Sequence, residues 1–135
     1  MKAISPLKTD LYSTVRKDSM HDPVSISNLI TDKYTLEILM YTYKKPKSIQ
    51  NISSTFGIPI AVCYRRVRRL EKLGFLRYVD QKLSGNGKWT KLYQSQVLNA
   101  YFFLEKGRFR ARVQLSSGKV DDFGGSWSLM DITTK

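Results

Sequence analysis

Five cationic side chains between residues 65 and 72 carry the chemistry of this sequence, and that chemistry is the binding of anions. They lie in the run Pro59-Ile-Ala-Val-Cys-Tyr-Arg-Arg-Val-Arg-Arg-Leu-Glu-Lys-Leu-Gly74. At about 100° of rotation per residue, Ile60, Val67 and Leu70 fall on the same side of a helix as Cys63. The pattern predicts a helix over 59–73 that buries an aliphatic stripe. Its opposite side carries a small residue, an aromatic residue and cations: Ala61, Tyr64, Arg65, Arg68, Arg69 and Lys72.

Nucleic acid is the anionic ligand that such a helix fits best. The N-terminal half of a helix in the major groove contacts base edges, and Ala61, Tyr64 and Arg65 hold these positions. Ala61 suits a thymine methyl group, and the Arg65 guanidinium suits guanine O6 and N7. The cations farther along the helix are expected at phosphates: Arg68, Arg69 and Lys72. A solvated basic face is the alternative, although like charges three or four residues apart then repel one another without any gain.

Two shorter helices are predicted before this segment. Thr31-Asp32 offers an N-cap for the first, and Ser48 is an N-cap candidate for the second. A turn at 56–59 joins the second helix to segment 59–73, as in a helix-turn-helix. The free N–H groups near Ser48, together with Lys47, are expected to hold a DNA phosphate. The expected apolar residues are Leu36, Leu39, Met40 and Tyr43 in the first helix, preceded by Leu29 and Ile30 at its entry, and Ile49, Ile52 and Phe56 in the second.

After Gly74 the apolar period changes to two, which is typical of strands. Residues 75–80 and 89–94 are predicted to pair around the tip Ser84-Gly-Asn-Gly87, because Asn-Gly accepts positive φ with little strain. Trp89 is expected to pack beneath this ribbon rather than to stack on a base. Three helices followed by such a basic ribbon, or wing, form a winged helix-turn-helix, which is an α+β fold. The expected polar residues of the wing are Lys82, Ser84, Asn86, Lys88 and Lys91.

A second β-hairpin is predicted over residues 98–115, with Lys106-Gly107 as its turn. One face of its second strand carries Arg108, Arg110 and Arg112 at steps of about 6.6 Å, and this face could extend a DNA footprint. The other interpretation is an exposed hairpin face whose opposite, apolar side packs on the core or on a second subunit. The remaining divisions are a flexible arm over 1–22, the winged helix-turn-helix domain over 23–97, and a Gly/Ser-rich tail over 116–135.

The composition favours a polyanionic partner and argues against several other classes. The 135-residue chain has a formal net charge of +12, which promotes rapid, salt-sensitive association with polyanions. Cys63 and His21 are the only residues of their types, so we expect no metal site, and Cys63 is expected as a small core residue. No constellation of catalytic residues is present, so neither an enzyme nor a cofactor is expected. No apolar run suits a membrane span or a secretory signal, which predicts a cytoplasmic, nucleoid-associated protein.

Four segments within residues 28–95 carry a family pattern: Asp32-Lys-Tyr-Thr-Leu-Glu-Ile-Leu39, Lys45-Pro-Lys-Ser-Ile-Gln-Asn-Ile52, Phe56-Gly-Ile-Pro59 and Arg69-Leu-Glu-Lys-Leu-Gly-Phe-Leu76. Together they resemble the ArsR-like (arsenical-resistance-repressor-like) winged helix-turn-helix regulators, in particular small archaeal ones. The resemblance implies a DNA-binding transcription regulator, usually dimeric. Metal-sensing members carry a thiol cluster near the recognition helix, whereas this chain has Cys63 alone. The hairpin over 98–115 departs from the minimal family pattern.

These observations predict a sequence-specific regulator that binds double-stranded DNA as a homodimer. Segment 59–73 is expected in the major groove, and the wing over 81–90 is expected on the backbone or in the minor groove. The alternatives are a non-specific architectural DNA- or RNA-binding protein and a winged-helix module for protein contacts in a transcription complex. The ratio of affinities for selected and random duplexes separates the first two classes. Failure to bind any duplex at low salt favours the third.

Overall fold

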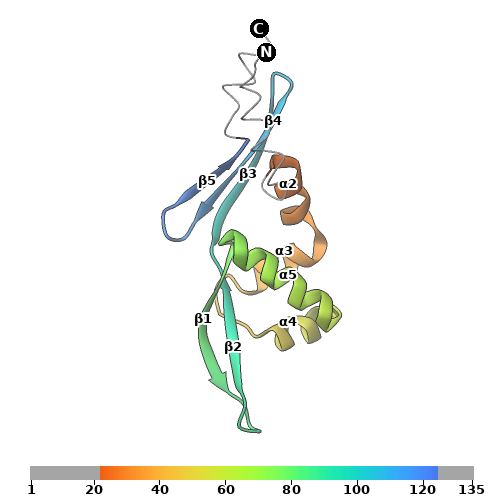
Figure 1. Cartoon of the computed structure of the whole chain (residues 1–135), viewed down its shortest axis with the longest axis vertical. Helices are drawn as coiled ribbons and strands as arrows, with labels where there is room; N and C mark the ends of the chain where they lie inside the picture. Colours follow the sequence, from red (N-terminus) through yellow and green to blue (C-terminus); the bar gives the residue numbers. More distant parts are fainter. Residues whose placement is uncertain (1–21, 125–135) are drawn as a thin grey trace. The chain divides into compact units, whose positions relative to one another are not determined.

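The computed structural model of the chain describes residues 22–124 and is an α+β fold (Figure 1), the class predicted from the sequence. Its described helices precede two antiparallel sheets, of two and three strands. None of the described helices is long and apolar enough to cross a membrane. The helices are α2 (Pro23–Thr31), α3 (Lys33–Tyr41), α4 (Ile49–Phe56) and α5 (Ile60–Leu73). The strands are β1 (Leu76–Leu83), β2 (Trp89–Ser95), β3 (Val97–Glu105), β4 (Arg108–Leu115) and β5 (Val120–Phe123).

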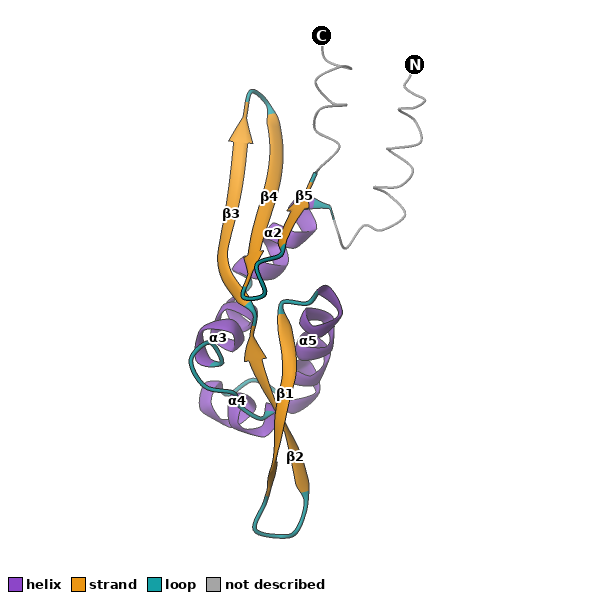
Figure 2. Cartoon of the chain, turned by 90° about the vertical axis from the view of Figure 1, so that its left-hand side faces the viewer, coloured by secondary structure: helices purple, strands orange, loops and turns teal. Residues whose placement is uncertain are grey.

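The chain divides into two compact units. The helical unit comprises residues 31–98 and 115–118, and it contains α3, α4, α5 and the β1–β2 hairpin. The sheet unit comprises the described residues of 1–30, 99–114 and 119–135. It contains nearly all of α2 and the sheet of order β3-β4-β5, and Figure 2 shows α2 beside this sheet.

Helix α2 was not predicted from the sequence, and it lies almost entirely in the sheet unit, whereas the helical unit contains three helices. Ile26, Leu29 and Ile30 are buried at helical spacing, so Leu29 and Ile30 belong to a helix of their own. The Asp22 carboxylate accepts hydrogen bonds from the Ser25 N–H (3.0 Å) and hydroxyl (3.1 Å), which caps the first turn. A nine-residue helix is marginal in isolation and depends on tertiary packing, so a local pattern signals it only weakly.

Helix α3 begins where the sequence predicted, but of its predicted apolar residues only Leu39 is buried. The Asp32 carboxylate caps the helix by accepting a hydrogen bond from the Thr35 N–H at 3.1 Å. The buried residues are Thr35, Ile38 and Leu39. Of the residues predicted to form the apolar side, Leu36 is 39% exposed, Met40 72% and Tyr43 44%. The error arises because Thr35, a polar residue, occupies a core position.

The turn between α4 and α5 follows the prediction closely. Ser48 caps α4 by accepting from the Asn51 N–H at 3.0 Å, and Ile49 and Ile52 are buried. Gly57 ends the helix in the left-handed region (φ 68°), which a residue with a side chain adopts only with strain. Pro59 is the N-cap of α5 rather than part of its first turn.

Both predicted hairpins are present in the structure. In the helical unit, β1 extends to Leu83, which pairs with Trp89, and Gly87 rather than Asn86 takes the positive φ of the tip (83°). In the sheet unit, Lys106 and Gly107 form the turn between β3 and β4, with φ values of 52° and 78°. Strand β5 adds a third strand beside β4, although it lies in the segment 116–135, where only a tail was predicted.

Candidate nucleic-acid interface

Helix α5 is held by an aliphatic stripe, largely as its sequence predicts. Cys63, Val67 and Leu70 are almost fully buried, whereas Ile60, predicted for the same stripe, is 46% exposed at the first turn. Burial raises the pKa of the Cys63 thiol, and its Sγ lies 3.8 Å from the Ile49 carbonyl oxygen. The prediction of a core role for Cys63 is therefore confirmed.

The opposite side of α5 is an exposed cationic face, as predicted. None of its arginines makes a hydrogen bond or an ion pair with another described residue. No described residue therefore engages their guanidinium donors, which suits them to an anionic ligand. The exposed residues of this α5 face are Ala61, Tyr64, Arg65, Arg68, Arg69 and Lys72.

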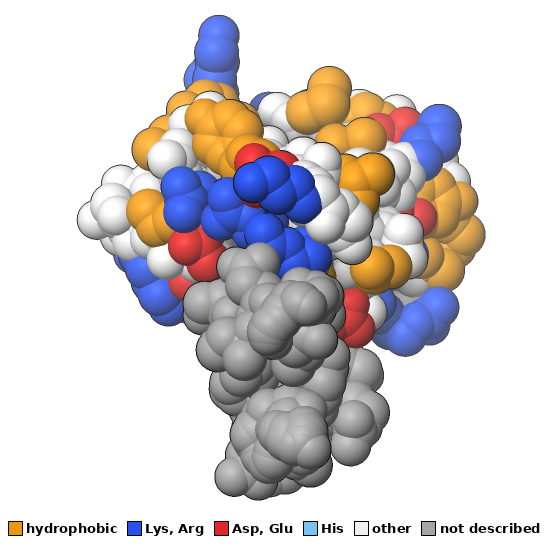
Figure 3. Space-filling view, turned by 90° about the horizontal axis from the view of Figure 1, so that it is seen from above, with side chains coloured by type: hydrophobic (Ala, Val, Ile, Leu, Met, Phe, Trp, Pro, Cys, Tyr) orange, Lys and Arg blue, Asp and Glu red, His pale blue; other side chains and the backbone are white. Residues whose placement is uncertain are grey.

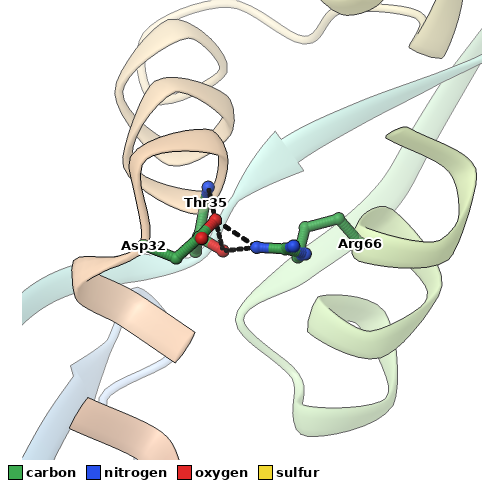
Figure 4. Close-up of polar contacts among 3 residues, drawn as sticks. All are labelled: Asp32, Thr35 and Arg66. Atoms are coloured by element: carbon green, nitrogen blue, oxygen red, sulfur yellow. Dashed lines mark hydrogen bonds and ion pairs between the residues drawn. The ribbon is translucent and has the colours of Figure 1, made fainter. Parts of the chain in front are cut away.

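Arg66 differs from its neighbours because it reaches across to helix α3 (Figure 4). Its guanidinium forms an ion pair with the Asp32 carboxylate and donates to the Thr35 hydroxyl at 3.1 Å. Burial raises the pKa of Asp32, but the Thr35 N–H and the Arg66 charge outweigh this effect and hold the pKa below its usual 3.8. Arg66 thus positions α5 rather than contacting a ligand. The helical period of the sequence does not distinguish Arg66 from the arginines around it.

A groove of about 740 Å³ lies between α5 and the β1–β2 hairpin, entirely within the helical unit. The α5 wall presents Tyr64, Arg68 and Lys72, which are four residues apart and so lie on one line along the helix. The β2 wall presents Trp89, Lys91 and Tyr93, which are two residues apart and so share one face of the strand. The remaining lining residues are Ile49, Gln50, Glu71, Lys88 and Thr90.

The groove carries an excess of positive charge. Its cations are Arg68, Lys72, Lys88 and Lys91, and Glu71 is the only carboxylate among the lining residues. The pKa of the Tyr93 phenol is raised by burial and, to a smaller extent, by Glu71. The phenol is therefore neutral at physiological pH, so the groove has the charge and the hydrogen-bond donors to hold phosphate groups along its length.

Trp89 corrects a prediction, because it does not pack beneath the ribbon. Its side chain is 64% exposed, and Leu83, its direct cross-strand partner, is 53% exposed. Figure 2 shows the physical reason: the β1–β2 hairpin extends past helices α4 and α5, so its outer end has no helix to pack against.

The other predicted contacts of the helical unit lie around this groove. Ser48 is 5% exposed and serves mainly as the cap of α4. The Lys47 backbone pairs with that of Tyr93 (2.9 and 2.8 Å), and its ammonium group lies 4.6 Å from the centroid of the Tyr41 ring. At the hairpin tip, the Ser84 hydroxyl donates a hydrogen bond to the side-chain amide oxygen (Oδ1) of Asn86. The lysines at 82, 88 and 91 are exposed.

Two of the three arginines predicted on the second hairpin, Arg110 and Arg112, pair with carboxylates within the sheet unit. Arg112 donates to both carboxylate oxygens of Asp122, at 2.7 and 3.1 Å, which raises the pKa of Arg112 and lowers that of Asp122. Arg110 lies 3.4 Å from Glu105 and above the Phe103 ring, 4.7 Å from its centroid. Arg108 is half-buried. Figure 3 likewise shows basic side chains gathered next to acidic ones on the face it draws. These ion pairs favour the interpretation that this hairpin packs rather than binds DNA.

Neither a metal site nor a family assignment explains the exposed cations of α5 and the groove beside it. The part of the chain that the structure describes holds no cluster of three or more His, Cys, Asp or Glu side chains suited to a metal ion, and His21 lies outside that part. No protein-family model matches the chain, and no curated protein matches it in sequence. The function must therefore be inferred from the exposed α5 face and the groove beside it.

Proposed function

We propose that this chain is a sequence-specific regulator of transcription that binds double-stranded DNA as a winged helix-turn-helix protein. Helix α5 serves as the recognition helix in the major groove, and the β1–β2 hairpin serves as the wing on the backbone or in the minor groove. The observation that carries this proposal is the exposed α5 face, whose arginines form no ion pair within the described residues and one of which, Arg68, lines a cationic groove.

The dimensions and residue types of α5 suit this role. A helix with its side chains is about 10–12 Å across, and the major groove is about 12 Å wide. In the N-terminal half of α5, Ala61, Tyr64 and Arg65 are exposed and positioned to read base edges. Arg68, Arg69 and Lys72 follow, closer to where the flanking phosphates would run. Bases and phosphates are thus assigned to different turns of the same helix.

The groove cations give the wing a defined part in binding. Lys88 and Lys91 face Arg68 and Lys72 across the groove, so one DNA strand can be held from both walls. The wing residues Lys82, Ser84 and Asn86 lie at or near the tip, where they would meet the sugar–phosphate backbone. The N-terminus of α4, with Lys47 and Ser48, is a further backbone contact, because helix N-termini attract phosphate.

Selection of binding sites from a random duplex pool tests this function. We expect Arg65→Ala to relax the preference at one base pair, at a cost of about 1–3 kcal/mol in discrimination. Lys88→Ala should weaken binding to all sequences and reduce the salt slope by about 1. Arg112→Ala is the matched control, because that arginine is already paired with Asp122. Equal affinity for selected and random duplexes would identify a non-specific architectural protein, and no binding at low salt would point to a protein-interaction module.

We also propose that the regulator acts as a homodimer through strand β3. Within the described residues, β3 is an edge strand with β4 as its neighbour, and it is nine residues long. Glu105 is its only charged residue, in a chain of net charge +12, and Tyr101 and Leu104 are 42% and 77% exposed. The opposite edge, β5, has four residues, and Asp121 and Asp122 are two of them. Long uncharged edges tend to pair, whereas short charged edges do not, so a second copy of β3 is the favoured partner.

Light scattering in high salt tests the dimer independently of DNA. Leu104→Lys should convert the dimer into a monomer, because it places a charge on the pairing edge. Val120→Lys on β5, which is also exposed, is the control and should leave the dimer intact. A wild-type monomer at all concentrations would contradict this interface.

A further inference from the structure

Two large apolar side chains stand together at the outer end of the β1–β2 hairpin. Leu83 and Trp89 are direct cross-strand partners, so their side chains lie on the same face of the ribbon. They are 53% and 64% exposed. Exposing a leucine and a tryptophan side by side to water is unfavourable, so this pair is a candidate contact surface.

The hairpin tip holds this pair on a well-defined turn. The Ser84 N–H donates to the Lys88 carbonyl oxygen at 2.7 Å, and the Gly87 N–H donates to the Ser84 carbonyl oxygen at 3.0 Å. The Lys88 N–H also donates to the Ser84 hydroxyl at 3.1 Å. These bonds close the loop directly after Leu83 and before Trp89, so the apolar pair sits on a hydrogen-bonded support rather than on a loose loop.

Cations lie next to the apolar pair on both faces of the hairpin end, and the face that carries the pair continues into the groove. Lys82 precedes Leu83, Lys88 precedes Trp89, and Lys91 lies one step farther along the same face of β2 as Trp89. Trp89 itself lines the groove together with Arg68 and Lys72 of α5. The pair therefore projects from a surface that is otherwise suited to phosphates. A ligand that fits both the cationic groove and the apolar pair must be a polyanion that can also expose apolar surface, as a duplex does when its base pairs separate.

We propose that Leu83 and Trp89 form a wedge that enters the DNA minor groove, inserts at a base step and bends the duplex. This inference rests on the proposed DNA binding and adds to it a specific mechanical effect on the DNA. Apolar side chains inserted between base pairs unstack them and kink DNA by about 20–90° toward the major groove. The bend would bring the flanking phosphates toward Lys82 and Lys88 and so repay the loss of stacking.

Duplex DNA fits this surface better than an anionic membrane, which also attracts a tryptophan flanked by lysines. A membrane interface would favour a cationic surface that can lie against a flat sheet of headgroups. Here the cations continue into a concave groove, with Arg68 and Lys72 on a wall opposite Lys91. Such a groove surrounds a strand rather than lying flat on a bilayer.

Energy transfer between the ends of a labelled duplex, combined with a base-stacking probe, tests the wedge. The duplex has about 30 base pairs and a central TA step. The TA step is used because pyrimidine–purine steps kink most easily. A 2-aminopurine next to this step fluoresces more strongly when it is unstacked. The full-length variants are Trp89→Ala, Leu83→Ala and the double substitution. Lys82→Ala is the matched control, because it removes a charge from the same ribbon and leaves the apolar pair intact.

We expect the wild-type chain to increase both energy transfer and 2-aminopurine fluorescence. Trp89→Ala should abolish both changes and weaken binding by roughly 5- to 150-fold, the range for loss of one aromatic–base stack, with the salt slope unchanged. Lys82→Ala should lower the salt slope and keep the bend. Because Leu83 and Trp89 are exposed, their removal should leave the circular dichroism spectrum and Tm unchanged.

Three results overturn the wedge, and they are distinguishable. Binding without bending, or bending that survives the double substitution, refutes the wedge and leaves the proposed function standing. No binding of the duplex at low salt refutes the proposed function together with the wedge. Trp89-dependent binding to vesicles of an anionic phospholipid, with unchanged DNA bending in Trp89→Ala, assigns the apolar pair to a membrane surface.

Discussion

Replacing either of two arginines on helix α5 by alanine should have opposite effects on protein stability and on DNA binding, although the two residues are only two positions apart. Arg66 forms an ion pair with Asp32 and donates to Thr35, whereas Arg68 lines the groove and has no ion pair within the described residues. We expect Arg66→Ala to lower stability and leave the electrostatics of DNA binding unchanged. Arg68→Ala should do the reverse. Because both changes replace an arginine by alanine in the same helix, the effect of helix propensity is similar in the two variants.

The magnitude for Arg66→Ala follows from the exposure of its contacts. The side chains of Arg66 and Asp32 are 23% and 36% exposed, so solvent screens their ion pair, which is worth up to about 1 kcal/mol. The hydrogen bond to the Thr35 hydroxyl adds about 0.5–1.5 kcal/mol. The sum is a loss of about 0.5–2.5 kcal/mol. For a domain of 60–100 residues this loss corresponds to a Tm lower by roughly 2–20 °C.

Thermal melts and salt titrations of DNA binding measure the two effects separately. Arg68→Ala should change the free energy of unfolding by less than about 0.5 kcal/mol, as exposed substitutions usually do, and should reduce the slope of log K against log salt by about 1. The reasoning is refuted if Arg66→Ala reduces the salt slope as much as Arg68→Ala does. It is equally refuted if the two variants lose the same stability.

Three further predictions concern the positioning of the site. The pKa of Asp32 is lowered in the folded state. Its contribution to stability should therefore be complete above about pH 4 and be lost as the pH falls through the lowered pKa. Acid titrations followed by circular dichroism should show a smaller loss of stability in Asp32→Asn than in the wild-type chain. Gly57→Ala should cost about 1–2 kcal/mol of stability in a denaturant melt, because φ is 68° and the new Cβ meets no atom within 4 Å, so the cost is backbone strain alone. The Cys63 thiol should react with a disulfide reagent far more slowly in the native protein than in denaturant, because it is buried and its pKa is raised; equal rates would contradict its core position.

The sequence predicted those parts of the fold whose causes are local. Asp32 and Ser48 cap their helices through bonds to the backbone three residues on, and such caps are recognisable in a short window. The turn at Lys106-Gly107 is equally local. Helix α2 and strand β5 were missed because both are short elements that depend on packing and pairing elsewhere in the chain. The same limit explains why Thr35 was not expected in the core.

The candidate site shows where periodicity stops being informative. A helical period separates buried from outward positions, and it correctly placed Cys63 inside and Arg68 outside. It cannot distinguish Arg66 from Arg68, because that difference depends on Asp32, 34 residues away in the sequence. Nor can a period of two report how far a hairpin extends past the helices beside it, which is what leaves Trp89 exposed. Both missed features arise from contacts, or a lack of contacts, between distant segments. These contacts separate the basic and aromatic residues of this unit that pack against other elements, such as Arg66, from those that stay exposed, such as Arg68 and Trp89.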